Sequence, residues 1–328
     1  MNENEIDNRV SKSDKLSVKE QRVDGSWSLK SESNLIRCTL MDFEINYLIN
    51  IPSKQFNRHF SNLKTLPKLN PWFITGFIDA EGSFVVSIYK NNKLKLGWSI
   101  FTRFKITLHL RDLVLLKKIQ DFFRGIGYIS KSTNKNSVAF EVRKQSDLNN
   151  IIVHHFVNYP LLTQKAADFI LFKQIIELMN KKIHLTSEGI IKIINIKASI
   201  NKGISEVIKS EFKNIIPVER PIIKTNNIPD LFWISVFITG EGCFDIRIFN
   251  SKTKIGFAVQ LRFQLVQHER EKYLMEVLIK YLGCGKIYKD PRSPALCLTN
   301  TKISDLNTKI INLFKNNYLH GIKQLYYL

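Results

Sequence analysis

An internal repeat is the feature of this sequence that most restricts its fold. Three pairs of segments match in the same order at offsets of 158 to 160 residues: 76–84 with 236–244, 95–109 with 254–268, and 146–149 with 304–307. The first pair reads GFIDAEGSF and VFITGEGCF, which places Glu81 and Glu241 at matching positions. Chance does not readily produce three ordered matches at nearly one offset, so the chain contains a duplicated unit.

Each copy of the repeat has the same order of predicted elements. Asn70 followed by Pro71 is typical of a helix start, and strand-like alternation follows the helix. In the first copy we predict helix 72–81, strands 83–90 and 95–110, helix 112–124, strands 128–131 and 138–143, and helices 147–156 and 165–179. In the second copy we predict helix 231–241, strands 244–250 and 254–268, helix 269–282, strands 286–289 and 295–299, and helix 304–316. Two αββαββα units predict an α+β protein with two pseudo-symmetric antiparallel sheets.

Composition divides the rest of the chain. Residues 1–66 are polar with short apolar runs, and we interpret them as a leader that is partly ordered or absent from the mature protein. The two units are predicted over residues 67–180 and 230–328. A linker over 181–229 joins them, with a helix over 187–199 and then an extended stretch that contains proline.

The chain is strongly basic, with 49 Lys and Arg against 29 Asp and Glu and a formal charge of +20 over 328 residues. A polyanion is the expected partner, nucleic acid first and an anionic membrane surface second. No run of 18 apolar residues exists, which excludes a transmembrane helix. The first 30 residues have no apolar core and several acids, which argues against a secretory signal or an imported transit peptide. The four cysteines form no CxxC pair, so disulfides and structural zinc are not expected, and the compartment is a reducing one.

One face of each predicted sheet carries polar and basic side chains. Strand alternation points Phe104 and Ile106 towards the helices and Arg103 and Lys105 to the opposite face. Such side chains can bind base edges in a major groove, so two curved sheets would form a saddle along a duplex. A solvated face without a partner is the alternative for any single position. The predicted reading residues are Ser87, Tyr89, Arg103, Lys105 and Thr107 in the first copy and Asp245, Arg247, Gln260, Arg262 and Gln264 in the second.

Each copy ends its first helix with a glutamate directly before a glycine. There Glu81 and Glu241 face the partial negative charge of a helix C-terminus, whose last carbonyl oxygens also lack partners. A divalent cation bound by carboxylate and carbonyl oxygens would make both features favourable. The small residues Gly76 and Ala80 let a second helix approach closely, which would bring the two glutamates together. Each carboxylate with its Mg²⁺ could then act on one phosphodiester bond.

Ordinary structural roles stay open for residues near these glutamates. A glutamate at a helix end is usually a surface residue, and the recurrence in two apolar helices is what favours function here. Asp79 is replaced by Thr239 in the second copy, so we assign it a structural role. His109 and His268 match at the strand ends, where they could contact phosphate or water, or simply cap the sheet.

The segments PWFITGFIDAEGSF (71–84) and LFWISVFITGEGCF (231–244) resemble the paired motifs of LAGLIDADG homing endonucleases. Over residues 68–328 the sequence looks like the single-chain, double-motif type found in fungal mitochondrial introns. The resemblance implies two αββαββα units with saddle-shaped sheets. It also implies a long, nearly asymmetric double-stranded DNA target and a staggered double-strand cut that needs Mg²⁺.

The resemblance also implies individual site residues. Gln267, which matches Leu108, would order water on one side only, and Val236 replaces the motif glycine in the second copy. That replacement bears on how closely the two helices cross. The implied metal ligands are Glu81 and Glu241 with the carbonyls of Ala80 and Gly240, and the implied catalytic lysines are Lys165 in YPLLTQK and Lys323 in YLHGIKQ.

These observations predict a site-specific double-strand DNA endonuclease of intron homing that acts as a monomer, with no membrane partner. The expected cofactor is Mg²⁺, with Mn²⁺ or Ca²⁺ able to replace it in binding. Because the N-terminus argues against import, a mitochondrial location would mean synthesis inside the organelle. An RNA maturase that binds its host group I intron is the main alternative, and a catalytically inactive DNA-binding protein is another. Retention of Glu81 and Glu241 favours cleavage over both.

Overall fold

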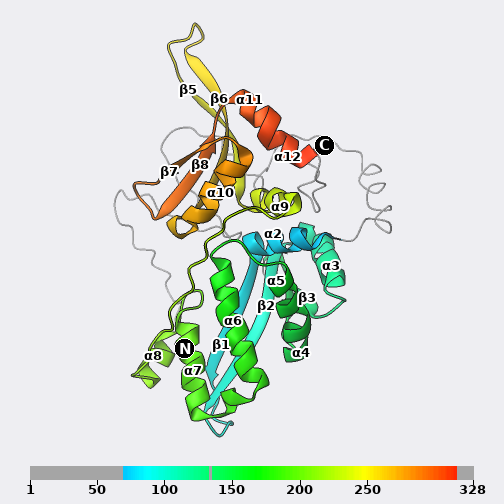
Figure 1. Cartoon of the computed structure of the whole chain (residues 1–328), viewed down its shortest axis with the longest axis vertical. Coiled ribbons are helices and arrows are strands. Elements are labelled where there is room, and N and C mark those ends of the chain that lie inside the picture. Colours follow the sequence, from blue (N-terminus) through cyan, green and yellow to red (C-terminus); the bar gives the residue numbers. More distant parts are fainter. Residues whose placement is uncertain (1–68, 133–134, 316–328) are drawn as a thin grey trace, which may run out of the picture.

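The computed structural model describes residues 69–132 and 135–315. The predicted leader and Lys323 lie outside these residues. Two units stand one above the other in Figure 1, with α2 (Pro71–Glu81) and α9 (Leu231–Glu241) between them. We call the part before the linker the first unit and the part from α9 onwards the second unit.

The first unit is a four-stranded antiparallel sheet with helices on one face, and its strand order is β1-β2-β4-β3. Besides α2 it contains β1 (Gly82–Lys90), β2 (Trp98–His109), η2 (Leu110–Asp112), α3 (Leu113–Phe122), β3 (Tyr128–Lys131), β4 (Ser137–Val142), α4 (Gln145–Asp147), the π turn η3 (Leu148–Val153), α5 (His154–Asn158) and α6 (Lys165–Asn180). The predicted element order is confirmed, although the helix predicted over 147–156 is interrupted by the wider π turn.

The second unit repeats this arrangement with the strand order β5-β6-β8-β7. Its further elements are β5 (Gly242–Asn250), β6 (Phe257–His268), η5 (Glu269–Glu271), α10 (Lys272–Leu282), β7 (Lys286–Lys289), β8 (Ala295–Asn300), α11 (Ile303–Asp305), the π turn η6 (Leu306–Ile311) and α12 (Asn312–Lys315). The predicted α+β class with two pseudo-symmetric antiparallel sheets is therefore correct.

Matching caps start the two central helices. The Trp72 N–H donates to Oδ1 of Asn70 over 2.7 Å, as the Asn-Pro pair predicts. In the second unit the Phe232 N–H donates to Oδ1 of Asp230 over 2.7 Å. Each cap satisfies a backbone donor that the helix itself leaves unpaired, so both helices begin at a fixed residue.

Helices cover the apolar face of the first sheet. In β1 the buried residues Phe84, Val86 and Ile88 alternate with half-buried ones. They pack under α6 and under the linker helix α7 (Ser187–Ala198), which supplies several isoleucines to the same core. The linker also contains η4 (Ile183–Leu185) and α8 (Glu206–Glu211), which the sequence did not predict. None of the helices in the described part of the chain has the length and apolarity that a membrane crossing needs.

The two central helices pack closely against each other. A Cβ atom on Gly76 would lie 2.5 Å from the Trp233 carbonyl oxygen, so only glycine fits there without a shift of the backbone. Val236, at the position of the motif glycine, is buried and packs into the core of the first unit. The valine therefore does not prevent close packing of the two helices, because its side chain lies in the apolar core of the first unit.

Candidate active site and nucleic-acid interface

The two motif glutamates lie where the C-terminal ends of α2 and α9 meet. Glu81 and Glu241 are each the last residue of their helix, and both are half-buried. A Cβ atom on Gly240 would lie 2.5 Å from the Cβ of Ala80 and 4.0 Å from Oε1 of Glu81. One helix end thus stands against the carboxylate of the other, as the repeat predicts.

A lysine from the start of α6 joins this meeting point. The Lys165 amine donates to the carbonyl oxygens of Ile78, over 2.8 Å, and Ala80, over 3.3 Å. Burial lowers the pKa of this amine, while the negative charges of Asp79, Glu241 and Glu81 act to raise it. Lys165 therefore lies within electrostatic reach of both motif glutamates. The structure brings together the three residues that the sequence placed in one site, whereas the matching Lys323 lies outside the described residues.

Asp79 has the structural role that the sequence assigned to it. Its carboxylate accepts hydrogen bonds from the Leu162 N–H, the Thr163 N–H and hydroxyl, and the Trp233 indole N–H. Burial raises the pKa of Asp79, and these hydrogen bonds oppose that effect. Asp79 therefore ties α2 to α9 and to the segment that precedes Lys165. Its counterpart Thr239 donates instead to the carbonyl of Ser235 over 2.7 Å.

Cation binding at the helix ends would rely on few protein atoms. Within residues 69–132 and 135–315, no group of three or more His, Cys, Asp or Glu side chains could hold a metal ion. Two glutamate carboxylates and the main-chain oxygens beside them are what this site offers. All of these donors are oxygen atoms, the ligand type that Mg²⁺ and Ca²⁺ prefer.

A buried acid organises the polar face of the first sheet. Glu141 on β4 is 5% exposed, and it accepts hydrogen bonds from the Tyr128 hydroxyl at 2.9 Å and from the Arg143 guanidinium. The amine of Lys105 lies 3.3 Å from the same carboxylate, and the guanidinium of Arg103 lies 3.9 Å away. Burial alone would raise the pKa of Glu141, but its hydrogen bonds bring that pKa below the usual value.

The polar face of the second sheet contains a buried ion pair. Asp245 and Arg262 face each other across β5 and β6, hydrogen-bond to each other, and are only 3% and 8% exposed. The pair therefore lies on the predicted face but not exposed to solvent, because each side chain uses the other as its partner, and a role in reading bases stays a prediction for both. Arg247 remains half-buried beside them, with Nε at 3.9 Å from the Asp245 carboxylate.

The other predicted reading residues also lie on the expected faces. Strand alternation and register put them on the side of each sheet away from the buried apolar residues. The Nε atoms of Arg103 and Arg247 are buried and lack a hydrogen-bond acceptor among the described residues. The side chains of Arg103 and Arg247 are nevertheless 33% and 38% exposed, so the exposed part of each can donate to an external partner. The remaining predicted residues on these faces are Ser87, Tyr89, Lys105, Thr107, Gln260 and Gln264, of which Tyr89 is exposed and the others are half-buried.

Three further candidates have ordinary positions. His109 and His268 each accept a backbone N–H two residues ahead at 3.2 Å, so both cap the turn that follows their strand. Gln267 is half-buried on β6, opposite Leu296 and on the face that carries the buried Leu265. These positions favour capping for the histidines and leave the predicted water-ordering role of Gln267 as a prediction.

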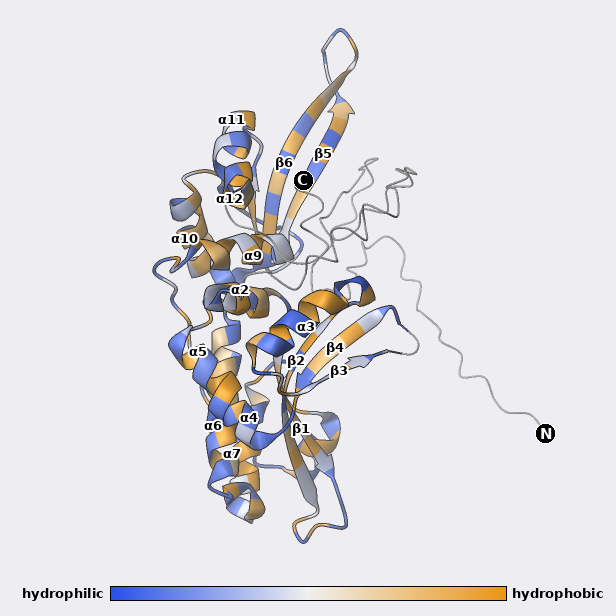
Figure 2. Ribbon diagram, turned by 90° about the vertical axis from the view of Figure 1, so that its right-hand side faces the viewer, coloured by the Kyte–Doolittle hydropathy of each residue, from blue (hydrophilic) through white to orange (hydrophobic). Residues whose placement is uncertain are grey.

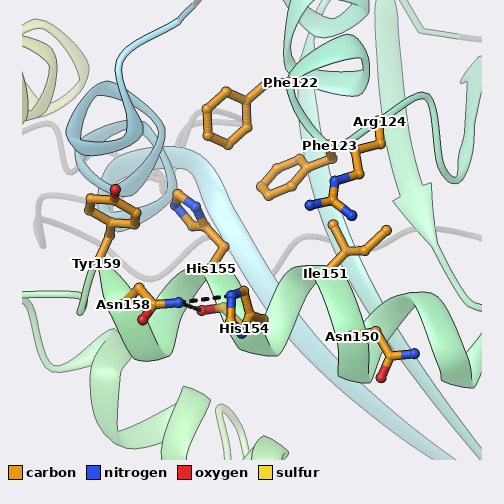
Figure 3. A pocket seen from close by; sticks show the side chains of 9 residues that line it. All are labelled: Phe122, Phe123, Arg124, Asn150, Ile151, His154, His155, Asn158 and Tyr159. Atoms are coloured by element: carbon orange, nitrogen blue, oxygen red, sulfur yellow. Dashed lines mark hydrogen bonds between the residues drawn. The ribbon is translucent and has the colours of Figure 1, made fainter.

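A pocket of about 530 Å³ opens beside α5 (Figure 3), and neither motif glutamate is among the residues that line it. Its lining includes Phe122, His155 and Tyr159, whose rings already pack on one another. Nε2 of His155 lies 3.3 Å from the Thr75 hydroxyl on α2. Burial and the charge of His154 lower the pKa of His155 to about 3, so this ring is neutral near pH 7. The His155 ring thus connects the lining of this pocket to α2.

Sequence reasoning missed two acids that matter to these surfaces. Glu141 and Glu271 are both buried and bound to residues distant in sequence. An acid inside an otherwise apolar strand is a recognisable signal, and it could have identified Glu141. Glu271 lies in the polar run Glu269–Lys272, which carries no such signal.

The sequence matches the LAGLIDADG endonuclease family profile over residues 74–176 and again over 234–328. It is 44% identical to "Probable intron-encoded endonuclease 3" of Neurospora crassa, an alignment that covers 100% of this chain and 65% of the relative. It is 41% identical to "Probable intron-encoded endonuclease 2" of the same fungus over 78% of this chain and 57% of the relative. The chain thus spans less than two thirds of the length of these relatives.

Solved structures give a matching result. The I-SmaMI LAGLIDADG homing endonuclease bound to cleaved DNA is 45% identical, with a TM-score of 0.75 over 79% of this chain and 87% of that one. The I-LtrWI LAGLIDADG homing endonuclease bound to target DNA is 37% identical, with a TM-score of 0.74 over 78% of this chain and 86% of that one. The two-unit fold and the saddle arrangement are therefore shared with these proteins.

Proposed function

Because this chain belongs to the LAGLIDADG endonuclease family, we propose that it is a site-specific endonuclease that cuts both strands of a long, asymmetric DNA target. The meeting of Glu81, Glu241 and Lys165 at the ends of α2 and α9 is the observation that carries this proposal. The solved relatives bound to cleaved and target DNA support double-stranded DNA as the substrate class. The names of the curated relatives support a protein that is encoded within an intron and acts in intron homing.

The proposal includes Mg²⁺ as the cofactor, with Mn²⁺ or Ca²⁺ able to replace it in binding. The carboxylates of Glu81 and Glu241 and the carbonyls of Ala80 and Gly240 would hold it, since these oxygen donors suit a hard cation. When bound, the cation would lower the pKa of an attacking water and offset charge on the scissile phosphate. I-SmaMI bound to an uncleaved DNA target in the presence of calcium ions supports the replacement by Ca²⁺.

The chain's own residues would position and polarise the substrate. The glutamates orient water beside the phosphate, and the meeting of α2 and α9 fixes the separation of the two cleavage centres. The Lys165 amine lies against the Ala80 carbonyl, where it can balance negative charge or hold a proton next to the phosphate. Lys323 takes the same role in the second centre on the strength of the repeat, and Gln267 orders water on one side.

The concave sheet faces would bind the duplex. Arg103 and Arg247 offer the exposed parts of their side chains, and Lys105 and the exposed Arg143 add positive charge near the same face. The buried Asp245–Arg262 pair would hold the neighbouring Arg247 in place. Ser87, Tyr89, Thr107, Gln260 and Gln264 complete the proposed reading set.

The test is strand-resolved cleavage by Glu81→Gln and Glu241→Gln, with the cut site first found by sequencing the ends of a cleaved random DNA library. Glutamine keeps the shape of each side chain and removes its charge. We expect loss of cleavage in Mg²⁺ with DNA binding in Ca²⁺ retained within a few-fold. Unchanged cutting by either variant would refute the assignment. Tight binding of the host intron RNA by a wild-type protein that cuts no DNA would favour the maturase alternative instead.

We further propose a mitochondrial location and action as a monomer. A relative from Podospora anserina, 40% identical over 52% of this chain and 41% of its own length, is named for an intron of ND4, which supports a mitochondrial gene. A single chain supplies both repeat units, so one molecule suffices for two cleavage centres. Sedimentation of the DNA complex would test the stoichiometry of one chain per duplex.

A further inference from the structure

The position of Lys165 depends on the segment that leads into α6. Gln164 is the residue before this helix, and its own side chain does not cap it. Its side chain donates instead to the Ile223 carbonyl in the linker, over 2.9 Å. The backbone N–H of Gln164 has no acceptor within the helix, because it lies at the helix start. Since Gln164 is buried, this N–H needs an acceptor from another segment.

Glu271 of the second unit supplies that acceptor. Its two carboxylate oxygens lie 2.9 and 3.0 Å from the Gln164 nitrogen, and the residue is only 5% exposed. It ends η5, so it reaches from the second unit to the first residues of α6. A carboxylate at a helix N-terminus is also favoured by the helix dipole. The start of α6, and with it the backbone of Lys165, is thus held from across the unit boundary.

Other contacts clamp the same segment from different directions. Asp79 on α2 binds Leu162 and Thr163, and Arg220 of the linker donates to the Gln164 carbonyl over 2.9 Å. These contacts fix the segment to the first unit and its linker. The Glu271 contact adds a dependence on where the second unit lies.

We propose that Glu271 is a positioning residue for the first cleavage centre: from the second unit it fixes the start of α6 and so aligns Lys165 against the Ala80 carbonyl. The inference rests on the proposed nuclease function. It makes one of the two strand cuts depend on how the units are docked. A shift of about 1 Å in a positioned group can cost on the order of 100-fold in rate, so a single contact of this kind can control a strand cut.

The raised pKa of Glu271 makes its contact with Gln164 depend on pH. Burial raises the pKa of Glu271 to about 7, while Arg270 on its own turn and Lys165 on α6 act to lower it and Asp79 on α2 acts to raise it. Below about pH 7 the carboxyl gains a proton and becomes a weaker acceptor for the Gln164 N–H. Alignment of Lys165 should therefore weaken on the acid side.

The decisive experiment measures each strand separately. Lys165→Met first identifies the strand whose cut needs Lys165. Glu271→Ala should then slow that strand roughly 10-fold or more, while the other strand stays within about two-fold, so nicked DNA accumulates. Asp112→Ala changes the matching residue of the first unit and should leave the Lys165-dependent strand unchanged. Equal slowing of both strands by Glu271→Ala, or no slowing of either, would overturn the proposal.

Two further readouts separate this proposal from the nuclease assignment. Amide hydrogen exchange needs no cleavage, and Glu271→Ala should accelerate exchange at Gln164 while sparing the backbone of β1. Unchanged exchange at Gln164 would overturn the positioning role even if the enzyme cuts DNA. Glu271→Gln keeps an acceptor oxygen but is neutral like the protonated carboxyl, so it should hold the Lys165-dependent cut at the rate that the wild type reaches on the acid side, above that of Glu271→Ala, and remove the decline below about pH 7. A decline that persists in Glu271→Gln would contradict the role of the carboxylate.

Discussion

The two units share the same sheet topology, but the polar faces of their sheets carry different charged residues. Both sheets have the same strand order and the same antiparallel pairing. The buried acid of the polar face lies on β4 in the first unit, as Glu141, and on β5 in the second, as Asp245. Glu141 lies beside basic side chains that remain partly exposed, whereas Asp245 is bound to the buried Arg262. A duplicated backbone thus presents two different surfaces, which suits the asymmetric target proposed above.

The units also differ in how their apolar faces are covered. Ile88 of β1 is 8% exposed under α6 and α7, while the matching Ile248 of β5 is 54% exposed. Ile246, Val259 and Leu261 are also exposed, and nothing in the described part of the chain covers them. Figures 1 and 2 show the β5–β6 hairpin extending beyond the helices of its unit. The difference indicates that buried apolar area, and with it stability, is concentrated in the first unit.

The largest expected effect comes from placing the same charge at this matched pair of positions. Ile88→Asp removes a buried side chain and buries a carboxylate without a partner, which should cost at least about 4 kcal/mol of folding free energy. Ile248→Asp places the carboxylate in solvent and should change stability by less than about 0.5 kcal/mol. Urea unfolding of the two variants measures both values. A similar loss in each would show that the hairpin face is covered in the folded chain.

The two buried acids provide the next test. Asp245→Ala leaves the Arg262 charge buried and uncompensated, which should cost about 3 kcal/mol. Glu141→Ala leaves Arg103, Lys105 and Arg143 with 33%, 31% and 57% of their side chains exposed, so water can replace the acid and the cost should be about 1 kcal/mol. Thermal unfolding of the two variants at one pH measures the difference. Equal costs would contradict the contrast between the two faces.

The contact between the units gives a pH-dependent effect. The folded pKa of Glu271 is about 7, above the ordinary value of 4.5, so the folded chain holds a proton that the unfolded chain releases between these values. Stability therefore falls as pH rises from about 4.5 to about 7, by between about 2 and 3 kcal/mol. Unfolding free energies measured across this range should show the decline in the wild type and a shallower one in Glu271→Gln. Parallel curves would show that Glu271 does not titrate in this window.

The elements of both units and the glutamate pair could be predicted from the sequence because their signals are local or repeated. Asn70, the helical run to Glu81 and the alternation in β2 each lie within one short segment. The repeat then tied Glu81 to Glu241 without any knowledge of packing.

What could not be predicted depends on register and on packing between distant segments. Asp245 meets Arg262 because the hairpin places them directly opposite each other, and the strand bounds alone leave that register open. Glu141 meets Lys105 through the pairing of β4 with β2, and Glu271 meets Gln164 only once both units are docked. The sequence shows which residues are charged, but it does not show which residues these side chains bind in the fold.

The smallest effect concerns the crossing of the two central helices. Gly76→Ala would place a Cβ 2.5 Å from the Trp233 carbonyl oxygen, so the helices must separate, at a cost of about 2 kcal/mol. Val236→Ala removes buried methyl groups without forcing a separation and should cost about 1.5 kcal/mol. Although the stability losses are similar, only Gly76→Ala moves the ends that carry Glu81 and Glu241. Strand-resolved cleavage should therefore fall on both strands in Gly76→Ala and stay within a few-fold in Val236→Ala. If Val236→Ala impaired cleavage as much as Gly76→Ala, loss of stability rather than the spacing of the carboxylates would explain both.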